Sequence, residues 1–132
     1  MRLLKLILVL LVCTVGPAVS ESHEDWQKTE YAFQPYWSGN PAKAAQQTRP
    51  LAERGSPSAQ AMLGSLYEEG AGVPQDYVLA YKWYILAISR YDPETNFHAR
   101  QEIITSRDKL RRNMTPAQLA EAQKLAREWK PK

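Results

Sequence analysis

The glycines near the middle of the chain raise the possibility of a phosphate site. Gly70-Ala71-Gly72 could open a GxGxxG pattern, in which backbone amides cradle the phosphates of a nucleotide. The third glycine position is instead Gln75, and no Lys-Ser or Lys-Thr pair follows. We therefore expect one helix to end at Gly70, the chain to turn through Gly72, and a new helix to begin after Pro74.

Few side chains are suited to acid–base catalysis. The two histidines, His23 and His98, lie far apart in the sequence. Glu68 and Glu69 are adjacent on a predicted helix, where consecutive side chains diverge by about 100°, so they cannot act as a carboxylate pair. We therefore predict no catalytic residue and no enzyme activity. The rival hypothesis, an envelope-acting hydrolase, would need Glu69, Asp76 or His98 as its acid–base groups.

Residues 1–20 have the three parts of a secretory signal peptide. Arg2 and Lys5 flank an apolar run that fades at Gly16-Pro17, and Ala18-Val19-Ser20 offers small residues for a signal peptidase. The run is shorter than the about 20 apolar residues that span a bilayer. We therefore predict a cleaved leader, an exported protein that is periplasmic or secreted, and no membrane span after cleavage. A retained membrane anchor is the alternative.

Cleavage would change the chemistry of the chain. It would remove Cys13, the only cysteine, and with it disulfides and thiolate metal sites. The remaining domain, residues 21–132, would carry 15 basic and 14 acidic residues, so its charge does not favour a nucleic-acid partner. Cleavage after Ser20 would also expose Glu21-Ser22-His23, whose amine, amides and His23 imidazole could bind Cu(II) or Ni(II). Apart from this hypothesis, we expect neither a metal nor a cofactor.

A basic cluster near the C-terminal end of a predicted helix has two interpretations. It consists of Arg107, Lys109, Arg111 and Arg112. Cations at this end of a helix complement its dipole. An anionic ligand, such as a lipid headgroup or an acidic glycan, is the functional alternative, and the sequence leaves both open.

Helix starts recur along the chain. A proline at the first helical position, preceded by Ser, Thr, Asp or Asn, is typical of a helix N-terminus. Starts of this kind, with one more before an uninterrupted helical run, are predicted at Asn40, Ser56, Asp76, Asp92 and Thr115. Asp76 follows Asn40 by 36 residues. Asp92 follows Ser56 by the same 36 residues, and alternating helix types at one period indicate stacked helical hairpins.

Apolar residues indicate which helices are buried. Residues 56–69 carry a single amphipathic stripe, whereas residues 77–88 are apolar on nearly all sides and should be sandwiched between other helices. Gly64 lies mid-helix, where it costs about 1 kcal/mol relative to alanine, which indicates a closely approaching backbone. Further helices are expected at 93–112, 116–129 and 26–37, and Pro35 should end or kink the last of these. The sequence thus predicts an all-α fold, a short stack of about three antiparallel helical hairpins.

These features resemble the Sel-1-like repeat family, which is related to the tetratricopeptide repeats. Residues 51–89 look like one complete repeat, and residues 40–54 look like the second helix of a preceding one. Residues 93–129 depart from the pattern and are predicted to form a C-terminal capping hairpin. The residues that carry the resemblance are Ala59, Leu63, Gly64, Tyr67, Gly70, Gly72, Pro74, Asp76, Ala80, Trp83, Tyr84 and Ala87.

The resemblance implies a scaffold for protein partners and no activity common to the family. In this superfamily the first helix of each hairpin lines the concave face. On residues 56–69 the side chains outside the buried stripe are Ser58, Ala61, Ser65, Glu68 and Glu69, whose acidity favours a basic partner segment. We therefore expect an exported scaffold that binds a protein or peptide in the cell envelope. A module that activates or matures a partner enzyme is a further alternative.

Overall fold

The computed structural model describes residues 22–132, and within this range it contains six α-helices and no strand. They are α2 (His23–Trp37), α3 (Pro41–Arg54), α4 (Pro57–Glu69), α5 (Tyr77–Arg90), α6 (Phe97–Arg111) and α7 (Pro116–Glu128). The predicted all-α fold of packed hairpins is confirmed. The predicted leader and Glu21 of the hypothetical copper or nickel site lie outside the described residues. None of the helices in residues 22–132 is long and apolar enough to cross a membrane.

Four of the five predicted helix starts are confirmed by their capping geometry. The side chains of Asn40, Ser56, Asp76 and Thr115 each accept a hydrogen bond from the backbone amide three residues later. Thr115 also forms the predicted capping box, because its own amide donates to Gln118 Oε1 at 2.9 Å. These caps satisfy amides that have no partner within the helix.

The fifth predicted start, at Asp92-Pro93, is wrong. The Asp92 carboxylate accepts hydrogen bonds from the amides of Glu94 (2.7 Å) and Thr95 (2.9 Å), which closes a turn rather than a helix. These bonds hold the pKa of Asp92 below its usual value. The helix begins only at Phe97, after the turn over residues 93–96.

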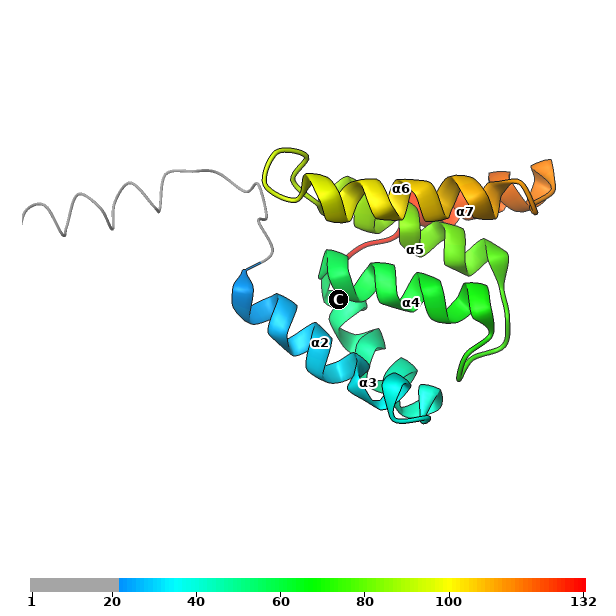
Figure 1. Ribbon diagram of the computed structural model, residues 1–132. Helices are drawn as coiled ribbons and strands as arrows, with labels where there is room; N and C mark the ends of the chain where they lie inside the picture. Colours follow the sequence, from blue (N-terminus) through cyan, green and yellow to red (C-terminus); the bar gives the residue numbers. More distant parts are fainter. Residues whose placement is uncertain (1–21) are drawn as a thin grey trace, which may run out of the picture.

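The helices stack as two antiparallel hairpins covered by a third pair (Figure 1). The first hairpin is α2 with α3 and the second is α4 with α5, while α3 packs on α4 between them. As predicted, α5 is sandwiched, because α4, α6 and α7 all pack against it. The predicted C-terminal hairpin differs from expectation in one respect: α6 and α7 pack chiefly on α5 rather than on each other.

The end of the chain returns to the first two hairpins (Figure 1). Trp129 meets Trp83 of α5 edge-on, with ring centroids 6.3 Å apart. The backbone amide of Lys132 donates to the carbonyl of Glu53 in α3 at 2.9 Å. The C-terminal segment therefore ties α7 to the α3–α4 junction.

Candidate binding groove

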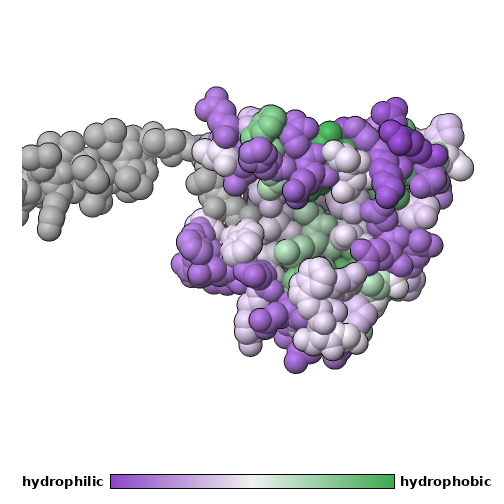
Figure 2. Space-filling model, viewed as in Figure 1, coloured by the Kyte–Doolittle hydropathy of each residue, from purple (hydrophilic) through white to green (hydrophobic). Residues whose placement is uncertain are grey.

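A groove of about 320 Å³ lies between α2, α4 and α6, the first helices of the three pairs. Tyr84 of α5 also lines it. Figure 2 shows the same face of the molecule, with green hydrophobic surface at its centre, pale surface of intermediate hydropathy beside it, and purple hydrophilic residues around the edge. Three segments that are far apart in the sequence thus meet around one concavity.

Aromatic side chains of α2 form one wall. The rings of Phe33 and Tyr36 are stacked with centroids 4.8 Å apart. Trp37 meets both rings edge-on, at 5.9 Å from Phe33 and 5.0 Å from Tyr36. Phe33 is buried in the core of the first hairpins, whereas Trp37 is 77 % exposed. This wall is therefore anchored at one end and open at the other.

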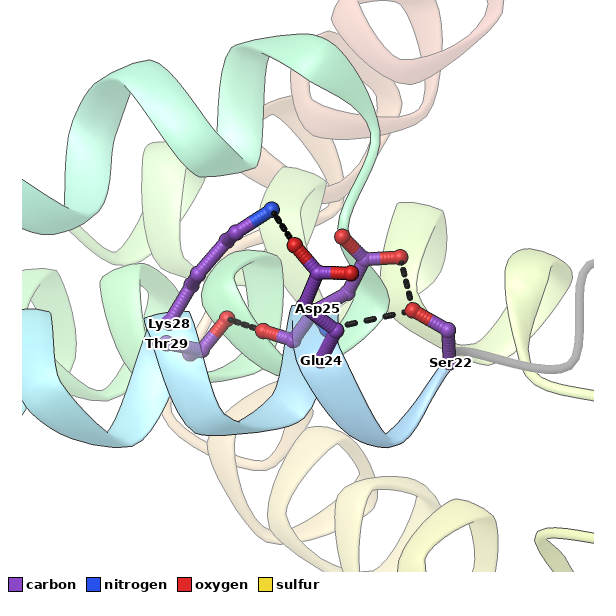
Figure 3. Close-up of polar contacts among 5 residues, drawn as sticks. All are labelled: Ser22, Glu24, Asp25, Lys28 and Thr29. Atoms are coloured by element: carbon purple, nitrogen blue, oxygen red, sulfur yellow. Dashed lines mark hydrogen bonds and ion pairs between the residues drawn. The ribbon is translucent and has the colours of Figure 1, made fainter.

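The start of α2 is fixed by a local polar network (Figure 3). Ser22 accepts the amide hydrogen of Asp25 at 3.1 Å and donates its hydroxyl to the Asp25 carboxylate at 2.7 Å. Lys28 forms an ion pair with Glu24 at 2.7 Å, one turn apart. The helix therefore begins at His23, three residues before the predicted start, and ends two residues after Pro35.

A polar contact joins α2 to the start of α4. The buried Thr29 donates to the carbonyl of Asp25 at 3.0 Å, and its hydroxyl lies 3.2 Å from that of Ser56, the N-cap of α4. The aromatic wall is thus held in register with the helix opposite.

The wall formed by α4 carries one acidic residue. This wall consists of Ala61, Met62, Ser65 and Glu69. The Glu69 carboxylate accepts a hydrogen bond from the Tyr36 hydroxyl at 2.7 Å, which bridges α4 to α2. This bond to a carboxylate raises the pKa of Tyr36.

Beside this wall, Glu68 is held by α5. Its carboxylate accepts a hydrogen bond from the Tyr84 hydroxyl at 2.6 Å. Burial of the phenol, reinforced by this bond, raises the pKa of Tyr84 well above its usual range. Glu68 therefore helps to fix Tyr84 and is half-buried rather than free on the surface.

The third wall comes from α6 and was not found from the sequence. Glu102, Ile103 and Ser106 line the groove from this side. Ser106 donates to the carbonyl of Glu102 at 3.1 Å. The equivalence of α6 to α4, as the first helix of its pair, is the signal that could have identified these residues.

Of the five predicted contact residues, three line the groove. Ala61, Ser65 and Glu69 do so, and Glu68 lies next to them against Tyr84. The expectation that Ser58 is accessible is wrong, because Ser58 is 5 % exposed. Its position in the first turn of α4 is covered by the neighbouring helices.

The loop after α4 is a structural turn. Gly70 and Gly72 have φ values of +68° and +70°, a region that L-residues with a side chain rarely adopt. A side chain at Gly72 would collide with the backbone of Pro41 and Ala42 at the start of α3. The loop thus closes against α3 and turns the chain between α4 and α5.

The groups required by the rival hydrolase are not gathered in the groove. Glu69 lines it, but Asp76 caps α5, and the exposed His98 lies against Phe97 in the first turn of α6. Within residues 22–132, no group of three His, Cys, Asp or Glu side chains could hold a metal ion. The described structure therefore does not bring Glu69, Asp76 and His98 together in one cleft.

The basic cluster lies at the C-terminal end of α6. Lys109 and Arg111 are in the last turn, and Arg112 is the C-cap residue. Arg107 pairs with the neighbouring Asp108 at 2.8 Å. This placement agrees with the helix-dipole interpretation, and none of the four residues lines the groove.

Residues 57–92 match the family model of the Sel1 repeat. The matched segment spans α4, the glycine turn and α5, ending at Asp92. No curated protein and no solved structure matches the chain.

Proposed function

Because the chain carries a Sel1 repeat at residues 57–92, we propose that it is a scaffold whose groove binds a segment of a protein partner. Sel1 repeats generally mediate protein–protein interaction and are typically non-catalytic. The observation that supports this proposal is the groove itself. It is mostly apolar and aromatic, and it joins the first helices of all three pairs. Concave, apolar surfaces with a few polar groups are the usual sites of binding.

A pair of variants on α6 tests the groove. Ser106 lines it and Thr105 does not, yet both hydroxyls bond to the carbonyl four residues earlier. Ser106→Trp would place an indole in the groove, while Thr105→Trp would add the same ring on the exposed surface. We expect the partner that co-purifies with the native protein to be lost from Ser106→Trp and kept by Thr105→Trp. Equal retention by both variants would show that the groove is not the binding surface.

The proposed place of action is the cell envelope. It rests on the leader-like composition of residues 1–20. We expect the protein in the periplasmic or secreted fraction, with an intact mass equal to that of residues 21–132. An uncleaved chain found in the cytoplasm would contradict this part of the proposal and leave the groove untouched. The proposed scaffold has no catalysis of its own. If the partner is an enzyme, the alternative in which the chain activates it predicts higher enzyme activity with the chain than without it.

A further inference from the structure

The groove carries an open aromatic ring at its rim. Trp37 is 77 % exposed, although Phe33 beside it is 8 % exposed and belongs to the core. An indole face attracts a cation that lies within about 6 Å of its centroid. The planar guanidinium of arginine is especially suited to this contact, because it also stacks on aromatic rings.

The same groove carries two carboxylates from different helices. Glu69 comes from α4 and Glu102 from α6, and no lysine or arginine is among the residues that line the groove. One oxygen of Glu69 accepts the Tyr36 hydroxyl. The ion pairs formed within residues 22–132 join Lys28 to Glu24, Arg107 to Asp108 and Lys132 to Glu53, so none neutralises either groove carboxylate.

These observations specify the chemistry of the occupant. We propose that the partner segment places an arginine side chain in the groove, between the Trp37 ring and the carboxylates of Glu69 and Glu102. An apolar neighbour of that arginine packs on the surface formed by Ala61, Met62 and Ile103. The inference rests on the proposed function and deepens it by naming the partner as a basic, partly apolar segment. Arginine fits better than lysine because its fork of donors can reach carboxylates in two directions while its face contacts a ring.

Selection from a library of random short peptides tests the inference without knowing the partner. The immobilised protein should enrich sequences with arginine next to an apolar residue. The double variant Glu69→Gln with Glu102→Gln keeps an acceptor for Tyr36 but removes both charges, and it should lose this enrichment. Glu121→Gln with Glu128→Gln, on exposed positions of α7, is the matched control and should select like the native protein.

A selected peptide is then compared with its citrulline twin, which has the shape of arginine without its charge. We expect the arginine peptide to bind about tenfold more tightly. Raising the salt concentration should reduce this difference, because exposed charges are screened. Trp37→Ala should weaken binding of the arginine peptide more than binding of its citrulline twin.

Each remaining outcome decides the question. Peptides that bind in the groove but show no preference for arginine over citrulline would overturn the inference and leave the proposed function standing. Peptides that still bind to Ser106→Trp would contradict the proposed function as well. If no peptide binds, the groove takes no such segment and the inference is overturned. It is also overturned if the native protein self-associates and the double glutamine variant does not, because the occupant would then be a second copy of the chain.

Discussion

The ring of Tyr84 lies directly against the backbone of α4 at Gly64. A methyl carbon at position 64 would be 2.8 Å from Cε1 and 2.9 Å from Cδ1 of that ring, and 3.2 Å from the carbonyl oxygen of Ala80. One turn further along α4, Glu68 accepts the Tyr84 hydroxyl at 2.6 Å. Since Gly64 and Glu68 lie on one face of the helix, the tyrosine is held at both ends of its side chain. Because Tyr84 also lines the groove, the packing of α5 on α4 and part of the groove lining depend on the same tyrosine.

Gly64→Ala should destabilise the protein although alanine favours a helix. Alanine contributes about 1 kcal/mol over glycine in a helix interior. Overpacking a close-packed site costs about 1–3 kcal/mol, and here a buried ring and a carbonyl are both too close. The net expectation is a fall of up to about 2 kcal/mol in the free energy of unfolding, measured by denaturant titration.

The tyrosine ring itself provides the control for this substitution. In the background of Tyr84→Ala the nearest obstacle is absent, so Gly64→Ala should cost much less or become stabilising. An equal cost in both backgrounds would show that the contact with Tyr84 is not the reason for the glycine.

The phenol of Tyr84 should make stability depend on alkaline pH. Burial and the bond to Glu68 raise its pKa in the folded protein above the usual value of 10.0. The associated stability is therefore fully present below about pH 10 and is lost as the pH rises from there towards the folded pKa. We expect the free energy of unfolding to fall more steeply above about pH 10 in the native protein than in Tyr84→Phe.

The other tyrosines, including Tyr36, are present in both proteins, so their contribution cancels in this comparison. At neutral pH, Tyr84→Phe should also be less stable by about 1 kcal/mol, because Glu68 loses a hydrogen-bond donor. Parallel pH profiles for the two proteins would mean that Tyr84 does not resist ionisation in the folded state.

The helix starts were predictable because a cap depends on residues three positions apart. The same local chemistry led to a wrong prediction at Asp92, whose side chain can cap a helix or close a turn by accepting hydrogen bonds from nearby amides. In the structure it bonds to the amides of Glu94 and Thr95, and α6 begins only after that turn. A proline after an aspartate fits both outcomes, so the sequence could not separate them.

The groove was only partly predictable for a different reason. Ala61, Ser65 and Glu69 follow from the helical period of one segment, and a single helix face is enough to identify them. Trp37 and Glu102 enter the groove through the packing of α2 and α6, which lie far from α4 in the sequence. Ser58 has the right period but lies where neighbouring helices cover the first turn of α4, so it is buried. Burial of this kind is a property of the assembled stack.

Gly72→Ala should destabilise the protein strongly. Its φ of +70° is costly for a residue with a side chain, by about 1–2 kcal/mol. A side chain there would also meet the backbone of Pro41 and Ala42, which cannot move without displacing α3. We expect a loss in the free energy of unfolding of about 3 kcal/mol or more, in the range of the larger effects of single substitutions.

Gly39 is the matched control for this substitution. It has a φ of +82°, but a side chain there would have no atom within 4 Å. Gly39→Ala should therefore show only the backbone strain of about 1–2 kcal/mol. The difference between the two variants measures how closely the loop packs on α3, and similar losses would indicate that the loop stands away from that helix.

Removal of the α7 cap should cost about 1 kcal/mol. Thr115 accepts the amide of Gln118 at 3.1 Å and donates its own amide to the Gln118 side chain at 2.9 Å, so Thr115→Ala breaks the first of these bonds and leaves one helix amide without its acceptor. Asn96, the N-cap of α6, makes no capping bond through its side chain, so Asn96→Ala should change stability by less than about 0.5 kcal/mol.

Thermal and denaturant unfolding of both variants would measure the contrast. Because α7 packs on the central α5 and is followed by Trp129, which contacts Trp83, the loss in Thr115→Ala should appear in global unfolding. A change confined to faster amide exchange in the first turn of α7, with unaltered global stability, would show that this helix end frays independently of the stack.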